Sequence, residues 1–137
     1  RMARGEVLSL RQQDVQLNGH SLECRINAED PQTFMPTPGL VQRWEVPGGF
    51  GVRVDSHVTT GYRVPPDCDA MVAKVITHDA TRDEALARMR LALGEMCVEG
   101  ITTNIPLHLA ILDDPGFCAG GVDIHHLEHW LQHRSPT

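Results

Sequence analysis

Lysine is almost absent from this sequence, since Lys74 is the only one among 12 basic residues. The formal net charge is −6, which argues against the clustered basic surface of a nucleic-acid binder. Aromatic residues make up 4% of the chain, too few to build a platform on which bases stack. No apolar run is long enough to cross a bilayer, and the N-terminus lacks the pattern of a secretory leader. We therefore expect a cytoplasmic protein that binds neither nucleic acid nor a membrane.

Cysteine pairs at metal-ligand spacing are also missing. The four cysteines are Cys24, Cys68, Cys97 and Cys118, and they form no Cys-x-x-Cys motif. Three of them lie within apolar patterns, where cysteine behaves as a small hydrophobic residue. We expect reduced thiols, with neither a structural disulfide nor a zinc site.

The length of 137 residues suits one domain, residues 1–137, and is too short for two of ordinary size. Residues 1–6 look like the last turn of a helix that Gly5 ends in the C′ position. The rest of that helix would precede Arg1, so we expect the sequence to be part of a longer chain.

A hairpin is expected around Asn18-Gly19, because both residues tolerate the positive φ of a type I′ turn. It would pair residues 14–17 with residues 20–26. In the second of these strands Leu22, Cys24 and Ile26 share one face by the period of two, which predicts that this face is buried.

The opposite face of that strand carries Arg25, with Glu23 and Asn27 on either side as candidates to orient it. One interpretation is a solvated strand face with a cross-strand ion pair. The other is a rigid guanidinium fork suited to a carboxylate, bicarbonate or phosphate. The residue pattern by itself leaves both open.

Further strands are expected at residues 40–46, 52–56, 62–64 and 71–77. The last of these is the most continuously apolar, with Lys74 as its only charge, so we place it in the centre of a sheet. The glycine-rich residues 47–51 lack the Gly-Lys-Ser/Thr ending of a phosphate-binding loop and predict a tight turn.

Three helices are predicted, at residues 82–98, 104–113 and 124–132, with a turn at residues 114–116 before the last. Thr81 and Glu84 form a capping box that specifies the start of the first. Strands thus dominate the first part of the chain and helices the second. This order predicts an α+β fold in which an antiparallel sheet with hairpins has helices packed to one side.

Histidines gather on the last predicted helix. His125, His129 and His133 recur at a spacing of four, with His126 beside them. A divalent metal could be bridged along such a face. Alternatively, the face is exposed and partly protonated near a helix C-terminus, which favours positive charge, and we expect no metal there.

The run from Glu23 to Pro31, Glu-Cys-Arg-Ile-Asn-Ala-Glu-Asp-Pro, resembles the C-terminal domain of biotin carboxylase. Other motifs of that family follow in its order, and the resemblance spans nearly the whole chain. They are Phe34-Met35-Pro36-Thr37-Pro38-Gly39, Pro47-Gly48-Gly49-Phe50-Gly51-Val52-Arg53, Asp55-Ser56-His57, Gly61-Tyr62, Val64-Pro65-Pro66, Asp69-Ala70-Met71 and Gly100-Ile101-Thr102-Thr103-Asn104.

The resemblance implies an enzyme that uses ATP and bicarbonate to carboxylate biotin on its carrier protein. ATP and Mg would be bound mainly by ATP-grasp and N-terminal domains upstream in the same enzyme. The partners implied are the biotin carboxyl carrier protein, a carboxyltransferase and a second copy in a homodimer. The leading interpretation is the biotin carboxylase subunit of a bacterial acetyl-CoA carboxylase, which serves fatty acid synthesis.

The resemblance also implies roles for particular residues. Arg25 would contact the ureido oxygen of biotin and help to stabilise its enolate form. Phe50 and Arg53 would lie at the homodimer contact, and Asp69 would have an interface or structural role. Ile124 and His125 would close over the adenine of ATP.

Two alternatives remain open. The chain could belong to another acyl-CoA carboxylase or to a pyruvate carboxylase. It could also be a dimerisation or lid module that completes the pocket of another domain, and on either interpretation we expect the isolated chain to be inactive.

Overall fold

The structure is a computed structural model that describes residues 2–67 and 69–133. Arg1, which begins the expected helix end, and the thiol of Cys68 lie outside the described residues. The strands are β1 (His20–Asn27), β2 (Gly39–Leu40), β3 (Arg43–Glu45), β4 (Val52–Ser56), β5 (Arg63–Val64), β6 (Met71–Asp79) and β7 (Cys97–Glu99). The helices are α1 (Arg82–Glu95), α2 (Ile105–Leu112), α3 (Pro115–Ala119) and α4 (His126–His133), with short 3₁₀ turns at Met2–Arg4 and Gln12–Asp14.

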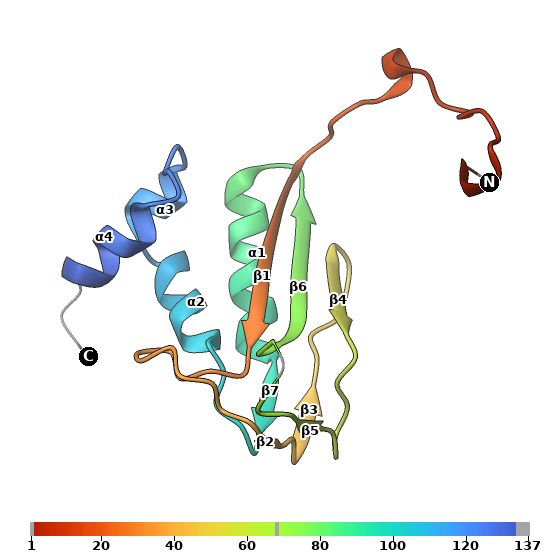
Figure 1. The fold of residues 1–137 in the computed structure, drawn as a ribbon. Coiled ribbons are helices and arrows are strands. Elements are labelled where there is room, and N and C mark those ends of the chain that lie inside the picture. The colour runs from red at the N-terminus through yellow and green to blue at the C-terminus, as the bar shows by residue number, and fades with distance from the viewer. Residues whose placement is uncertain (1, 68, 134–137) are drawn as a thin grey trace.

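The main sheet has three antiparallel strands in the order β1-β6-β4 (Figure 1). The central position predicted for the 71–77 strand is therefore confirmed. Val72, Val75 and Thr77 of β6 are buried, because α1 packs against this strand. The other face is polar, and the register aligns Arg25, Lys74 and Asp55 in one row across the three strands.

One hydrophobic core lies between the main sheet and the helices. In β1 Cys24 and Ile26 are buried, while Glu23 and Arg25 are exposed, as the alternation predicted. The largest of the fully buried side chains are Ile26, Val41, Val72, Val75, Thr77, Met89, Leu93 and Leu112. Among the described residues, no helix is both long and apolar enough to cross a bilayer.

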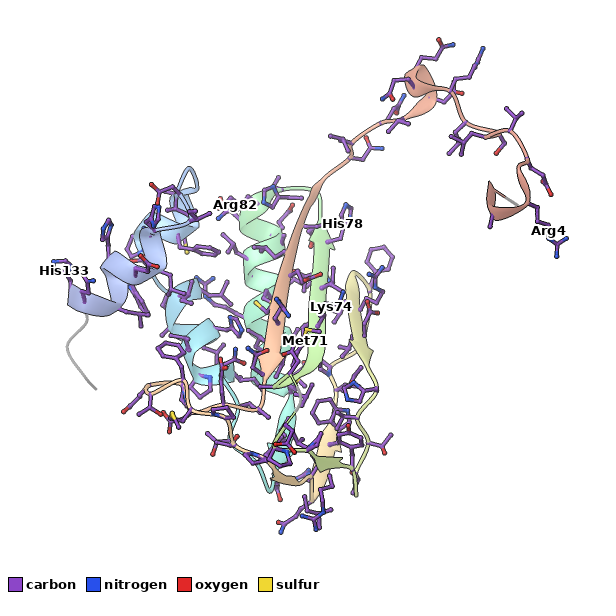
Figure 2. All side chains as sticks on the ribbon, in the orientation of Figure 1. Arg4, Met71, Lys74, His78, Arg82 and His133 are labelled. Atoms are coloured by element: carbon purple, nitrogen blue, oxygen red, sulfur yellow. The ribbon has the colours of Figure 1, made fainter. Side chains whose placement is uncertain are left out.

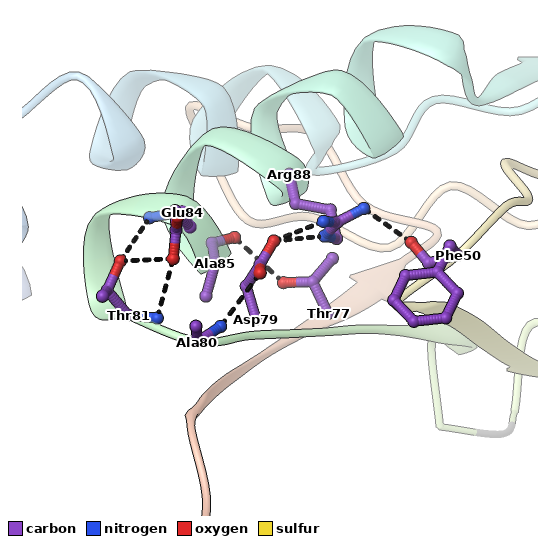
Figure 3. A network of polar contacts seen from close by, with 8 residues as sticks. All are labelled: Phe50, Thr77, Asp79, Ala80, Thr81, Glu84, Ala85 and Arg88. Atoms are coloured by element: carbon purple, nitrogen blue, oxygen red, sulfur yellow. Dashed lines mark hydrogen bonds and ion pairs between the residues drawn. The ribbon is translucent and has the colours of Figure 1, made fainter.

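Helix α1 begins where its capping residues predicted (Figure 3). The Thr81 hydroxyl accepts from the Glu84 N–H at 3.3 Å, and the Glu84 carboxylate accepts from the Thr81 N–H at 3.0 Å. Both bonds satisfy N–H groups that a helix start leaves without partners. The buried hydroxyl of Thr77 then donates to the carbonyl of Ala85 at 3.1 Å, which ties β6 to this first turn.

The hairpin predicted between residues 14–17 and 20–26 is wrong. Residues 12–14 form a 3₁₀ turn, and β1 pairs along its whole length with β6, from His20 opposite Asp79 to Asn27 opposite Met71. Pairing with β6 gives β1 a central apolar partner, whereas Val15 and Leu17 remain exposed. The segment before β1 extends away from the rest of the fold (Figure 1).

Other predicted boundaries also change. The strand expected at 40–46 is split, because β2 pairs with β5 and β3 pairs with β7. The first helix was predicted to reach residue 98 but ends at Glu95, since residues 97–99 join β3 as a strand. The turn expected at 114–116 is instead the start of α3, with Asp114 accepting from the Phe117 N–H at 2.7 Å as its cap.

Gly19 does have the positive φ predicted for it, at 73°, but uses it to bring the chain against β6. A Cβ at this position would overlap the carbonyl oxygen of Asp79. Gly121 is a matched control, since its φ is 75° and a Cβ there would meet nothing within 4 Å. Alanine at a positive φ costs about 1 kcal/mol by itself.

We predict that Gly19→Ala lowers the free energy of unfolding by at least about 1 kcal/mol more than Gly121→Ala, because only Gly19→Ala adds a backbone overlap to the strain. Urea unfolding of the two variants measures the difference. Equal losses would show that the chain relaxes around residue 19 without cost.

Candidate functional site

Arg25 lies on the exposed polar face of β1, with 59% of its side chain accessible. Its Nε donates to the Met71 sulfur at 3.2 Å. Its Nη2 lies 3.8 Å from Oδ2 of Asp69, whose other carboxylate oxygen accepts from the Met71 N–H at 3.0 Å. Met71 occupies the start of β6 (Figure 2). The structure therefore brings together two residues of the predicted site, Arg25 and Asp69.

The guanidinium of Arg25 retains donors for a ligand. It offers five N–H groups, and the ion pair with Asp69 is long and exposed, so that it contributes little stability. Glu23, which we expected to orient Arg25, instead lies 4.0 Å from the ammonium of Lys74. Lys74 stands directly opposite Arg25 in the ladder. Like charges in opposite positions are unfavourable, and here the carboxylates of Glu23, Asp69 and Asp55 lie beside the two cations and offset the repulsion.

The main chain of Arg25 is held by two side chains of the α2 region. Asn104 donates from Nδ2 to the Arg25 carbonyl at 3.1 Å, and His108 donates to the same oxygen from Nε2 at 2.9 Å. Sequence reasoning placed Asn104 at the end of a family motif and near the start of a helix without a contact to Arg25, and it missed His108. Their four-residue spacing on a helix was visible in the sequence, but their contact with Arg25 depends on the tertiary fold.

Phe50 and Arg53 lie at the other edge of the main sheet, on the turn before β4 and on β4. Phe50 is 93% exposed, and Arg53 pairs with Asp55 at 3.2 Å on the surface. Arg53 shares the exposed face with Arg25, because it stands opposite Ile76, which is itself opposite Glu23. An exposed aromatic ring beside an arginine is typical of a protein interface.

A polar network holds the turn that presents Phe50 (Figure 3). Arg88 of α1 donates to the Phe50 carbonyl at 2.6 Å and also binds the carboxylate of Asp79. These hydrogen bonds hold the pKa of Asp79 below its usual range, so the carboxylate stays charged beside Arg88. On the other side of the turn the Gly51 carbonyl accepts from the His78 N–H at 2.9 Å.

Ile124 and His125 precede α4 and are both exposed, Ile124 by 89%. Ile124 borders an apolar hollow of about 150 Å³ that Ile111, Phe117 and Trp130 also line. Helix α4 is joined to the start of α3 through His126, whose Nε2 lies 2.9 Å from Oδ2 of Asp114. The pKa of Asp114 is lowered mainly by the hydrogen bond that its carboxylate accepts from the Phe117 N–H, and next by the bond with His126.

The histidines of this region do not converge. His125 lies 3.5 Å from Glu128, whereas Nδ1 of His133 lies 2.7 Å from the carbonyl of His129. Over residues 2–67 and 69–133, no group of three or more His, Cys, Asp or Glu residues is arranged to hold a metal ion. Cys24, Cys97 and Cys118 are free thiols, and burial raises the pKa of Cys24 to about 12.

The family model of the biotin carboxylase C-terminal domain matches residues 23–129 of this chain. The chain belongs to that family. The match includes Arg25, Phe50, Arg53, Asp69, Ile124 and His125, so every residue of the predicted site lies within the family domain. The family suggested by the sequence motifs is thereby confirmed.

Several relatives of this chain are named biotin carboxylase. That of Pseudomonas aeruginosa is 62% identical over 131 residues, covering 96% of this chain and 29% of the relative. That of Haemophilus influenzae is 55% identical with the same coverage. A pyruvate carboxylase component of Methanothermobacter thermautotrophicus is 43% identical over 131 residues, covering 95% of this chain and 27% of the relative. The chain thus spans less than a third of these relatives.

Solved structures of the family share the fold. The biotin carboxylase domain dimer of Hydrogenobacter thermophilus 2-oxoglutarate carboxylase, in complex with MgADP, ADP and bicarbonate, has a TM-score of 0.92 at 40% identity and covers 99% of this chain and 31% of that one. A biotin carboxylase complex of Campylobacter jejuni has a TM-score of 0.89 at 38% identity, and the match covers 93% of this chain and 28% of that one. The predicted α+β class with an antiparallel sheet is confirmed, although the predicted hairpin is not.

His108 provides a test of the contact with Arg25. Burial lowers the pKa of its imidazole, so the folded protein favours the neutral ring. The unfolded chain binds a proton more readily, with a pKa of about 6.5. The stability that neutral His108 contributes is therefore present above about pH 6.5 and declines as the pH falls below it.

We predict that His108→Gln, which keeps a donor but does not titrate, makes the loss of stability between about pH 6.5 and pH 5 shallower. Urea unfolding at both pH values gives the slope, with His57→Gln as the control at an exposed histidine. A slope unchanged by His108→Gln would show that the ring is protonated as easily in the folded protein as in the unfolded one.

Proposed function

We propose that this chain is the C-terminal domain of a biotin carboxylase, an ATP-dependent ligase that carboxylates biotin on its carrier protein with bicarbonate. Membership of the family and the 62% identity to the Pseudomonas aeruginosa biotin carboxylase support the proposal. The domain works with ATP-grasp and N-terminal domains of the same enzyme, which bind most of the ATP and Mg. By itself it is inactive.

The observation that carries this proposal is the placement of Arg25. Its guanidinium is fixed to a strand, is more than half exposed, and stands opposite Lys74 on a polar face. A biotin carried on another protein can reach such a position. The spare donors of Arg25 would hold the negative charge that develops on the ureido oxygen, and preorganised donors of this kind stabilise a transition state strongly.

ATP supplies the phosphoryl group that activates bicarbonate. This chain would contribute Ile124 and His125 to the adenine side of that site. The exposed Ile124 side chain beside an apolar hollow fits a planar base, and the exposed ring of His125 can stack or donate. On this proposal, the remainder of the adenine site comes from another domain, which would cover the exposed side chains of Ile124 and His125.

We further propose that the enzyme is the cytoplasmic biotin carboxylase of an acetyl-CoA carboxylase in fatty acid synthesis, which passes carboxybiotin on its carrier to a carboxyltransferase. The higher identity to relatives named simply biotin carboxylase supports this assignment. A pyruvate carboxylase is the second candidate, supported by the 43% identity to the Methanothermobacter thermautotrophicus protein. Carboxylation assays of the reconstituted enzyme with acetyl-CoA and with pyruvate as the carboxyl acceptor distinguish the two.

Arg25→Ala in the intact enzyme should lower the rate of biotin carboxylation by on the order of 10² to 10³, the usual loss for a transition-state donor. Arg25→Lys should restore little, because an ammonium cannot reproduce the fork. Bicarbonate-dependent ATP cleavage should fall less. The melting temperature should hardly change, since the side-chain contacts of Arg25 are exposed.

The matched control is Arg63→Ala, which removes another exposed strand arginine and should leave the rate unchanged. Steady-state rates and thermal melts of the three variants decide the role. A large melting shift with proportional loss of all activities would mean that Arg25 acts through stability alone, and the lid-module alternative would then be preferred.

The homodimer contact is proposed to include Phe50, Arg53 and Asp69. The solved biotin carboxylase domain dimer of Hydrogenobacter thermophilus supports a dimer in this family. In this chain, Arg88 holds the main-chain carbonyl of Phe50 in the turn before β4, and the ring itself is exposed, while Asp69 lies beside Arg25. An interface at this edge would bury the ring and pair the surface charges of β4.

Phe50→Ala and Arg53→Glu should each weaken self-association of the intact enzyme by about tenfold or more, since aromatic and arginine anchors dominate interface energies. Sedimentation velocity across a concentration series measures the shift. Phe34→Ala removes another exposed phenylalanine, in the loop between β1 and β2, and should have no effect. An unchanged dimer population in both test variants would exclude this edge as the contact.

A further inference from the structure

Helix α2 begins at an asparagine that does not cap its own helix. Asparagine is a favoured N-cap residue because its oxygen accepts from an N–H in the first turn. Asn104 makes no such bond, although it is 4% exposed. Its Oδ1 accepts from the Asn27 N–H at 2.9 Å, and its Nδ2 donates to the Arg25 carbonyl at 3.1 Å. The side-chain carboxamide of Asn104 therefore binds the backbone of β1 and not the first turn of its own helix.

The two groups that Asn104 binds belong to one edge of β1. In a strand, the carbonyl of one residue and the N–H of the residue two positions on point to the same side. β1 is the outer strand of its sheet, so these groups of Arg25 and Asn27 have no neighbouring strand. The carboxamide of Asn104 binds these two groups as the peptide group of a neighbouring strand would. In addition, the main-chain N–H of Asn104 donates to the Asn27 carbonyl at 3.2 Å.

The bonds from Asn104 to β1 lie next to an irregularity in the pairing of β1 with β6. The register between β1 and β6 shifts between Ile26 and Asn27. His108, one helical turn after Asn104, donates to the same Arg25 carbonyl at 2.9 Å, so that this oxygen has two donors. The backbone of Arg25, which is still in register opposite Lys74, is thus also held from α2, just before the pairing with β6 becomes irregular.

The side chain of Arg25 has weaker constraints than its backbone. Over the residues that the structure describes, its guanidinium has one hydrogen bond, to the Met71 sulfur, and one long, exposed ion pair, with Asp69. The direction of the guanidinium therefore depends on where the backbone holds its Cα–Cβ bond. A displacement of about 1 Å at a reacting centre can lower a rate on the order of 10².

We propose that Asn104, supported by His108, is a positioning residue for Arg25 in the carboxylation of biotin. This inference rests on the proposed function of Arg25. It assigns to the start of α2 a part in catalysis that requires no contact with biotin or ATP.

The test is a double-mutant cycle in the intact enzyme. In the background with Arg25, Asn104→Ala and His108→Phe should each lower kcat for biotin carboxylation by roughly tenfold, with a smaller change in KM for biotin. In the Arg25→Ala background, the same substitutions should change kcat less than about twofold, because no guanidinium remains to be positioned. Equal fold losses in both backgrounds would overturn the inference and indicate a general structural effect.

The second variant of the cycle and one added control keep the result decisive. His108→Phe preserves a ring of similar size, so it tests the inference even where Asn104→Ala does not fold. His57→Phe is its control, since His57 is exposed and makes an edge-on ring contact with Tyr62 that phenylalanine can keep. If Arg25→Ala alone leaves carboxylation unchanged, the proposed function fails instead, which is distinguishable from a failure of the positioning role.

Discussion

β6 pairs with β1 on one edge and with β4 on the other. The proposed biotin site and the proposed dimer contact both depend on this pairing. β1 carries Arg25, and β4 with its preceding turn carries Arg53 and Phe50. β6 can hold this position because its buried side is apolar and packs against α1, and its one buried hydroxyl, Thr77, is satisfied by Ala85. Sheet and helix thus fix the two surfaces relative to each other.

The parts of this fold that were predictable are those where a local signal and the tertiary environment agree. The apolar run of β6 indicated a central strand, and Thr81 with Glu84 specified the start of α1. The alternation in β1 placed Ile26 inside and Arg25 outside. The α+β class followed from the same elements, because their order along the chain does not depend on which strands pair.

The wrong predictions of the hairpin and of the end of α1 concern a choice between strand partners. Asn18-Gly19 favoured a local hairpin, but β6 offered β1 a longer apolar partner from a distant part of the chain. Residues 97–99, which the pattern assigned to the end of α1, pair with β3 as a strand. A helical pattern cannot reveal that a distant strand competes for the same residues. Asn104 was missed for the same reason, since the carbonyl that it binds lies 79 residues earlier.

The structure also explains why Arg25 is better suited than another arginine to receive a ligand. Arg43 is held by Glu45 at 2.9 Å and by Glu99 at 3.1 Å, so an incoming anion would have to displace two close carboxylates. Arg25 faces one carboxylate at 3.8 Å that is itself mostly exposed, and water screens that pair strongly. Exchanging such a partner for an oxygen of the substrate costs little. The availability of Arg25 therefore arises from a rigid backbone combined with a weakly bound head group.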